Sequence, residues 1–392
     1  MDLSSTLRLL REHIAGRVGI PSASVNVRRA DEPPCEGWEL VIGCSSPEEL
    51  RTAVGSAEFV GWMGGPVART PLAIVRPACT IEGAPDSFRV VAVVPTYDEA
   101  DILDRTIAHL VVNGLEVHVI DNWSTNGCRE IAESWRGRGV VAIDSYPEEG
   151  PEARFDWQEL LRRVPRIGTA TGAHWTTLND ADELRESPWR GVTLRDALWH
   201  VQQSGFNCVN LTQIDFLLTD PAVARDGLPF GLPLEAAFPY LRSPAIGDMT
   251  QMKFWKNGIY EVDIASTGGH TARFPGRRVF PYNFLQRHYP YRSATQAAAK
   301  IDSRVLRQPK AEWKLGWGSH YPAITPKFPM ASTGEVRFDE GFAENYLVER
   351  LSAIGWRKEI EPPTSIKHRL ARALDTVGLW KYYEASKKRH ER

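Results

Sequence analysis

Two carboxylates stand one residue apart in Asp180-Ala181-Asp182, directly after an apolar segment typical of a buried strand. Side chains at positions i and i+2 of a strand point to the same side, so both carboxylates can converge on one cation. Oxygen ligands favour a hard divalent ion such as Mg²⁺ or Mn²⁺. The pattern therefore predicts a metal site at a strand end. The alternative is an acidic turn that caps a helix beginning near Ser187 and Pro188.

Two earlier segments place polar side chains in an equivalent position. Residues 95–99 (PTYDE) and residues 121–127 (DNWSTNG) each follow a β-branched apolar run. Ligands of open α/β sheets bind outside the carboxyl ends of the strands. We therefore expect both segments to face the same side as Asp180, with Asp121 placed to accept from a ribose hydroxyl or a base N–H. Helix capping is the alternative role of these polar residues.

The surrounding sequence supplies the elements that must position these residues. β-Branched runs predict strands, and apolar residues at helical spacing predict the helices between them. The expected strands cover 89–95, 117–121, 140–143, 174–178 and 209–216, and the expected helices cover 100–112, 124–136 and 155–164. Strands that alternate with helices indicate parallel pairing through right-handed crossovers. The predicted fold class is thus α/β, a Rossmann-like, doubly wound, mostly parallel sheet.

Three regions are expected along the chain. They are a small α+β accessory unit over 1–85, a catalytic domain over 86–293 and a helical C-terminal region over 294–392. The first boundary rests on the turn-rich linker 81–87. A helix over 294–307 is expected to open the last region.

Composition and charge exclude several classes of protein. Lys and Arg number 47 against 49 Asp and Glu, so no overall basic field exists to hold nucleic acid. Five widely spaced cysteines include no CxxC pair, which argues against a zinc ribbon and fits a reducing, cytoplasmic setting. No uninterrupted apolar run approaches the length of a transmembrane helix.

The segment 366–392 predicts a basic amphipathic helix. It carries eight Lys or Arg against three Asp or Glu, and apolar residues recur on one face. Such a helix can make peripheral contact with the inner face of an anionic membrane. The alternative is docking on the catalytic domain with a solvated basic face.

The three polar segments together resemble the GT-A glycosyltransferases, and within them the family-2-like group. The resemblance rests on VVPTYDEA, VIDNWSTNG and LNDADE, which match the family's P-x-Y-N-E, D-x-x-S-x-D-G-T and D-x-D segments in order and spacing. It covers about residues 88–290. Asp98 stands where the family usually has Asn, and Asn126 and Cys128 stand where it usually has Asp and Thr. These positions shape the turns more than the chemistry.

The resemblance implies a metal-dependent transfer of a sugar from a nucleotide-diphospho-sugar to an acceptor hydroxyl. The reaction would belong to polysaccharide, glycolipid or glycoconjugate synthesis, with a saccharide, a lipid-linked sugar or a small molecule as acceptor. The donor-binding residues implied are Pro95, Thr96, Tyr97, Glu99, Asp121, Arg166 and Asp180, with Gly168 beside Arg166. The implied ligands for Mn²⁺ or Mg²⁺ are Asp180, Asp182 and His270. The metal would offset charge on the departing nucleotide.

An inverting transferase also needs a general base that deprotonates the acceptor hydroxyl. A carboxylate between the D-x-D motif and His270 should supply it, and the candidates are Asp248 and Glu235, with Asp215 third. The family's usual E-D dipeptide is not found there, so the stereochemical outcome stays open. The segment 287–293 could either contact phosphate or pack its aromatic residues against the sheet.

Large aromatic side chains offer a further set of candidates. Aromatic faces stack on sugar rings, so Trp255, Trp313 and Trp317 could line an acceptor groove, although large aromatics are more often core.

Three other functions stay open on the sequence. A nucleotidyltransferase of similar sheet would normally show a glycine-rich basic loop after the first strand, which residues 95–99 do not form. A catalytically silent nucleotide-sugar-binding module would bind donor without turnover. A scaffold protein, in which the acids only cap helices, would bind neither nucleotide nor metal.

Overall fold

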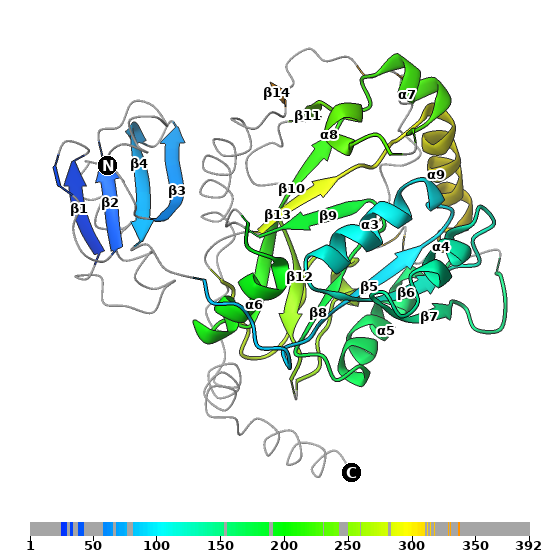
Figure 1. Ribbon diagram of the computed structural model, residues 1–392, viewed down its shortest axis with the longest axis horizontal. Coiled ribbons are helices and arrows are strands. Elements are labelled where there is room, and N and C mark those ends of the chain that lie inside the picture. Colours follow the sequence, from blue (N-terminus) through cyan, green and yellow to red (C-terminus); the bar gives the residue numbers. More distant parts are fainter. Residues whose placement is uncertain are drawn as a thin grey trace, which may run out of the picture.

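The computed structural model describes residues 81–309 apart from short gaps at 153–154, 188–190, 230, 243–249, 259 and 281–283. It also describes strands and a few positions between 25 and 76, and isolated positions between 312 and 337 (Figure 1). The expected base Asp248, Trp313 and the expected helix over 366–392 lie outside the described residues.

Residues 25–76 contain a four-stranded sheet of their own. Its strands are β1 (Val25–Arg29), β2 (Trp38–Ile42), β3 (Glu58–Gly65) and β4 (Ala68–Arg76), in the order β1-β2-β4-β3. β1 and β2 are parallel, whereas β4 runs antiparallel to both β2 and β3.

The next part of the chain alternates strands with helices, as the sequence predicted. Its strands are β5 (Val90–Thr96), β6 (Glu116–Asp121), β7 (Val140–Ser145) and β8 (Trp175–Leu178), and its helices are α3 (Ala100–Val112), α4 (Cys128–Ser134) and α5 (Trp157–Ala170). The strands pair in parallel in the order β8-β5-β6-β7. All their carboxyl ends therefore open on one side of the sheet.

The later strands turn this parallel sheet into a mixed one. The strands are β9 (Glu183–Glu186), β10 (Cys208–Phe216), β11 (Tyr240–Arg242), β12 (Thr250–Lys256), β13 (Phe284–His288) and β14 (Val336–Arg337). β12 lies antiparallel between β8 and β10, and β10 continues to β11 and β14. β13 pairs in parallel with β10 and antiparallel with β9.

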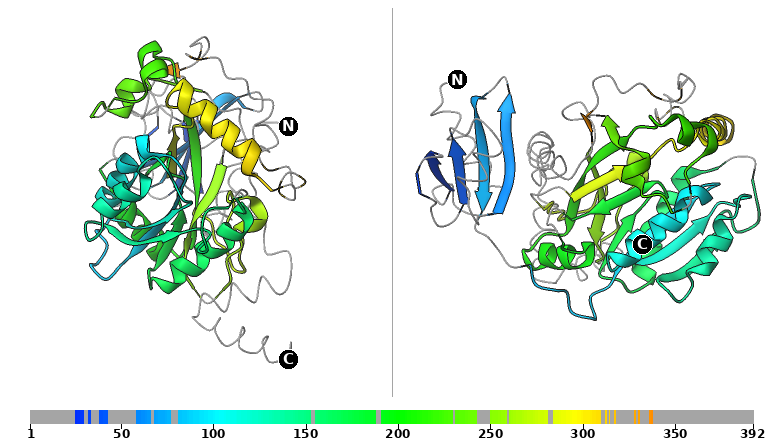
Figure 2. Two further views of the ribbon diagram at one scale, coloured as in Figure 1. Left: turned by 90° about the vertical axis from the view of Figure 1, so that its right-hand side faces the viewer. Right: turned by 45° about the horizontal axis from the view of Figure 1, so that its top comes forward.

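The remaining helices are α6 (Leu194–Gln203), α7 (Pro221–Asp226), α8 (Leu234–Ala237), α9 (Ala294–Arg307) and the 3₁₀ turn η2 (Ala265–Thr267). α9 has the bounds that the sequence predicted, because the Ser293 side chain accepts from the Gln296 N–H at the helix start. Figure 2, left, shows α9 in front of the sheet. β14 adds a strand to the region from 294 onward, which the sequence predicted as helical.

The apolar core forms on both faces of β5. Val90, Ala92 and Val94 pack in one buried cluster with residues of α3, α4 and α6. Val93 points to the opposite face and packs with residues of α5. This alternation is the two-residue period of a strand, and burial on both faces explains the continuous β-branched run. The doubly wound arrangement is thus confirmed for the parallel half of the sheet.

The helix expected over 124–136 starts later than predicted, and the capping alternative for the D-x-D segment is excluded. α4 begins after Gly127, which adopts a left-handed φ of 102°, and Ser124 does not cap it. The D-x-D segment caps no helix, because β9 starts at Glu183 and the next helix starts at Leu194. The acidic segment is instead a turn between two strands.

Candidate active site

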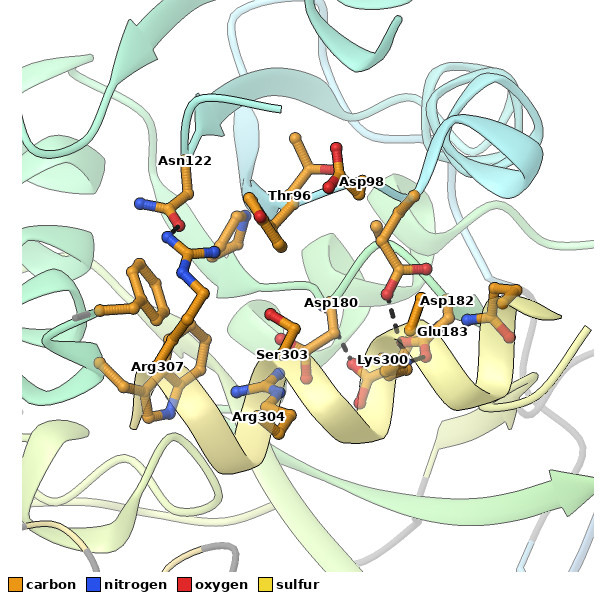
Figure 3. Close-up of a pocket in the computed structure, with 18 of the residues that line it drawn as sticks. Thr96, Asp98, Asn122, Asp180, Asp182, Glu183, Lys300, Ser303, Arg304 and Arg307 are labelled. Atoms are coloured by element: carbon orange, nitrogen blue, oxygen red, sulfur yellow. Dashed lines mark hydrogen bonds and ion pairs between the residues drawn. The ribbon is translucent and has the colours of Figure 1, made fainter. Parts of the chain in front are cut away.

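A pocket of about 980 Å³ opens at the carboxyl ends of β5, β6 and β8. The loops that follow these strands form one side, and a face of α9 forms the opposite side (Figure 3). Residues of β10, β12 and β13 complete one end. The pocket therefore crosses the domain boundary expected at residue 293, because α9 supplies part of its wall.

The loops after β5 and β6 are joined into one wall. Asp98 has a φ of +53°, a conformation that Asp and Asn tolerate better than other side chains. The Thr125 N–H donates to the Asp98 carboxylate at 2.7 Å, and the Asp98 N–H donates to Ser124 Oγ at 3.0 Å. Asp98 in place of the family's Asn thus serves the turn.

One end of the pocket combines an aromatic face with a cation. The guanidinium of Arg307, at the end of α9, lies 3.9 Å from the centre of the Tyr97 ring. Arg307 also donates to Asn122 Oδ1 at 2.5 Å, as Figure 3 shows. A flat ring, an amide and a stacked guanidinium are the groups that recognise planar heterocycles.

The D-x-D carboxylates contact two different lysines. Lys253 Nζ lies 2.9 Å from Asp180 Oδ2, and Lys300 Nζ lies 2.5 Å from Asp182 Oδ2. Burial opposes ionisation of Asp180, but the nearby charges of Lys253 and Arg304 hold its pKa at about 2. Burial opposes ionisation of Asp182 as well, and Lys300 lowers the pKa of that carboxyl well below its ordinary value. Both acids are therefore charged at neutral pH.

A buried charge cluster lies beneath the D-x-D turn. Lys253 Nζ also contacts Glu183 at 2.8 Å, and Arg185 contacts the same carboxylate at 2.8 Å. The side chains of Glu183 and Lys253 are 2% exposed and that of Arg185 is fully buried. Gln286 donates to Glu183 Oε1 and accepts from Arg185 Nε. Buried charges persist when each has a partner, and this cluster supplies one for every member.

The segment 287–293 places one side chain in the pocket and packs another against the core. His288 lines the pocket, where its Nδ1 lies 2.7 Å from Asp215 and its Nε2 lies 3.6 Å from Asp182. Burial disfavours the charged ring, yet Asp182 and Asp215 raise the pKa of His288 well above its ordinary value. Tyr289 instead packs away from the pocket, stacked on Phe216 at 4.7 Å.

Arg292 ties this segment to the loop after β5. Its buried guanidinium pairs with Asp101 at 2.6 Å and with Glu99, and it lies 3.8 Å from Asp182. The ion pair between Arg292 and Glu99 holds Glu99 at the pocket wall, where the Glu99 carboxylate also lies 3.2 Å from Lys300 Nζ.

Most of the residues expected from the motifs meet in this pocket. Those that line it are Pro95, Thr96, Tyr97, Glu99, Asp180, Asp182 and His270. Among the expected aromatic residues, Trp317 also lines it, whereas Trp255 is fully buried in the core.

Three expected residues lie elsewhere. Asp121 is buried behind the pocket wall, where its carboxylate accepts from the Ser124 N–H. Arg166 is exposed on α5, away from the pocket-lining residues. Glu235 lies on α8, where its carboxylate pairs with Arg287 of β13, and it is not among the described residues that line the pocket.

Gly168 packs against Thr176 so closely that an added Cβ would lie 2.0 Å from Thr176 Oγ1. Gly168 therefore serves helix–strand packing.

The side chains that line the pocket fit a divalent cation whose ligands come partly from the protein and partly from a bound phosphate. Within the part of the chain that the structure describes, no three His, Cys, Asp or Glu side chains form a metal-binding group. Mg²⁺, however, is commonly held by one or two carboxylates together with substrate phosphates. Asp180, with a side chain one-third exposed, and the neighbouring Asp182 supply such carboxylates, and His270 lines the same pocket.

Sequence reasoning did not find the cations that line the pocket or the buried lysine beneath it. Lys253 comes from β12, and Lys300, Arg304 and Arg307 come from α9. The positions 300, 304 and 307 fall on one face of the helix predicted over 294–307, and that spacing was the signal available.

Residues 91–148 match the family described as Glycosyl transferase family 2. No curated protein matches the chain in sequence. Among solved structures, TarS from S. aureus is 12% identical over 57% of this chain and 41% of that chain, with a TM-score of 0.28. TarS 1–349 from S. aureus in complex with UDP is 11% identical over 77% of this chain and 92% of that one, with a TM-score of 0.28.

Glucosyl-3-phosphoglycerate synthase from Mycobacterium tuberculosis, in complex with Mn²⁺, UDP and glucosyl-3-phosphoglycerate, is 17% identical over 47% of this chain and 63% of that one, with a TM-score of 0.26. The family match covers most of β5, all of β6 and β7, and the loops after β5 and β6, and it ends before the D-x-D turn. Together with the Rossmann-like sheet, this match makes residues 91–148 similar to the family-2-like glycosyltransferases of the GT-A fold.

None of the described helices is both long and apolar enough to span a membrane.

Proposed function

We propose that this protein moves a sugar from a nucleotide-diphospho-sugar to an acceptor hydroxyl, with Mn²⁺ or Mg²⁺ bound beside the diphosphate. One observation carries the proposal. Tyr97, Asn122 and the D-x-D carboxylates, which come from three different strand ends, line one pocket. This arrangement supports the proposal because one cavity offers groups for a nucleoside at one end and for a diphosphate with its cation at the other.

Each pocket group has a role in this reaction. Tyr97 and Asn122 contact the nucleoside, and Arg307, which stacks on Tyr97 and donates to Asn122, holds both in place. Asp180 and Asp182 hold the cation, and His270 lies on the same wall. The cation, when bound, offsets the charge that develops on the departing nucleotide.

The acceptor enters at the other end of the pocket in this proposal. Gln213, Gln251 and His288 line that end, and their amide and imidazole groups can bind hydroxyls. Asp248 precedes Gln251 by three residues, and we propose it as the general base. Glu235 is the weaker candidate because its carboxylate pairs with Arg287.

The acceptor class in this proposal is a saccharide, a lipid-linked sugar or a small molecule, within polysaccharide, glycolipid or glycoconjugate synthesis. We propose that the reaction takes place in the cytoplasm, because the few, widely spaced cysteines fit a reducing compartment.

A thermal-unfolding screen tests the proposal. UDP-, GDP-, dTDP- and CMP-linked sugars are added with and without Mn²⁺ to the wild type and to Asp182→Ala, because a ligand that binds the native state raises Tm. The matched control is Glu159→Ala, which removes an exposed carboxylate on α5. We expect a Mn²⁺-dependent rise with one donor that Asp182→Ala loses and Glu159→Ala keeps.

A second measurement follows release of free nucleotide from that donor in the presence of candidate acceptors. Donor binding without nucleotide release under any acceptor would favour a silent binding module. No rise in Tm with any donor would reject the proposal.

A further inference from the structure

One face of α9 carries three cations toward the pocket. Lys300, Arg304 and Arg307 occupy positions i, i+4 and i+7, which share a face of an α-helix, and all three line the cavity (Figure 3). With a rise of 1.5 Å per residue, they extend over about 10 Å of helix. This spread suits an elongated anion better than a single ion.

The three cations reach from the D-x-D turn to the nucleoside end. Lys300 contacts Asp182 at 2.5 Å and Glu99 at 3.2 Å. Arg307 stacks on Tyr97 at the far end. Arg304 stands between them, with its guanidinium 5.8 Å from the centre of the Trp157 ring. A ligand that spans from Tyr97 to Asp182 must therefore pass along Arg304.

The opposite wall of the pocket is acidic. Asp98, Glu99, Asp180, Asp182 and Glu183 all line it. A diphosphate placed against these carboxylates alone would be repelled, since like charges at contact distance disfavour binding. Charge-assisted hydrogen bonds from lysine and arginine are the strong contacts for phosphate, and α9 supplies them from the facing wall.

We propose that Lys300 and Arg304 bind the diphosphate of the donor, and that Lys300 exchanges Asp182 for a phosphate oxygen as the donor enters. This inference rests on the proposed function, because it names the residues that receive the donor. Without donor, Lys300 neutralises Asp182 and competes with a divalent cation for that carboxylate. Donor binding removes this competitor, so cation and donor bind together.

Calorimetric titrations separate the diphosphate contact from the nucleoside contact. The probes are the nucleoside diphosphate of the donor that raises Tm most in the screen, tried first with UDP, and the matching nucleoside. The variants are Lys300→Met and Arg304→Met, and the control is Arg162→Met, whose arginine is exposed on α5 and pairs with Glu159.

We expect each α9 variant to weaken diphosphate binding by about 10-fold or more, the size expected for one charged hydrogen bond. Nucleoside binding should be unchanged, and Arg162→Met should match the wild type. Lys300→Arg keeps the positive charge, so it should retain most of the affinity for the diphosphate. This result would show that Lys300→Met acts through the lost charge. Diphosphate affinity that survives both substitutions overturns the inference while leaving the proposed function intact.

Titration of Mn²⁺ alone, followed by electron paramagnetic resonance, tests the exchange. Lys300→Met should bind Mn²⁺ more tightly than the wild type in the absence of nucleotide, because Asp182 has lost its competitor. Equal Mn²⁺ affinity would overturn the exchange. A wild type that binds no nucleoside diphosphate would instead overturn the proposed function, and this inference with it.

Discussion

Lys253 lies directly beneath Asp180, with its ammonium 2.9 Å from the carboxylate and its side chain 2% exposed. The same ammonium contacts Glu183 at 2.8 Å. One buried cation from β12 thus fixes Asp180 in the turn after β8 and Glu183 at the start of β9. Asp180 is held in place before any ligand arrives, which lowers the cost of ordering it on binding.

Replacing Lys253 with Met should destabilise the protein strongly. The change leaves Glu183 and Asp180 without their shared cation, and breaking a buried ion pair from one side costs about 3–5 kcal/mol. Thermal unfolding should show a fall in Tm of roughly 10 °C. The double variant Lys253→Met with Glu183→Gln removes the orphaned charge and should recover part of that loss. A single variant as stable as the wild type would contradict this assignment.

Replacing Asp182 with Asn should impair catalysis far more than folding. The substitution keeps the size of the side chain but removes the charge that Lys300 and the proposed cation share. We expect kcat/KM to fall on the order of 10²-fold or more, as for other losses of one electrostatic group at a reacting centre. Titrating Mn²⁺ into both proteins is the check, because the variant should need a much higher concentration. An unchanged Mn²⁺ dependence would count against a metal at Asp182.

Replacing Gly168 with Ala should lower stability without selective loss of nucleotide binding. The new Cβ would lie 2.0 Å from Thr176 Oγ1, so β8 and α5 must separate, at about 1–3 kcal/mol for an overpacked core. Gly83→Ala is the matched control, since an added Cβ there meets no atom within 4 Å. Denaturant unfolding measures the difference. A loss of nucleotide affinity at unchanged stability would instead indicate a donor contact.

The pH dependence of stability should carry a contribution from His109. Burial on α3 lowers the pKa of this histidine below its ordinary 6.5, although its ring lies 2.7 Å from the Arg185 carbonyl. The folded state therefore prefers the neutral ring. Its stabilisation is fully present above pH 6.5 and is lost as the pH falls toward the lowered pKa.

The check compares the free energy of unfolding of the wild type and of His109→Gln across this range. The wild type should lose more stability than the variant as the pH falls below 6.5. Parallel curves would show that His109 titrates as it does in the unfolded chain.

The sequence predicted the parallel half of the sheet well because its signals are local. The run from Val90 to Val94 alternates between two buried clusters, so both faces had to be apolar. Helix α9 was predicted at its true bounds because Ser293 caps it and alanines follow. Strand β9 was missed because its sequence, ELRE, is charged. Its charges are buried only because Glu183 and Arg185 pair with each other and with distant residues.

The sequence motifs predicted those site residues that directly follow a strand. Tyr97, Asp180 and Asp182 were found because each stands at a strand end. Motif spacing does not give the direction of a side chain, which is why Arg166 was expected at the donor and is exposed on α5. Lys253 could not be found, because it meets Asp180 only through the pairing of β12 with β8.

The position of α9 in the chain sets the order in which the pocket is made. During synthesis on the ribosome, β5 through β13 emerge before residue 294, so the acidic strand ends exist before the helix that faces them. A chain that ends at residue 293 contains β5 to β13 and the D-x-D turn, but it lacks β14 and α9. If Lys300 and Arg304 bind the diphosphate as proposed, donor binding begins only once α9 has been made.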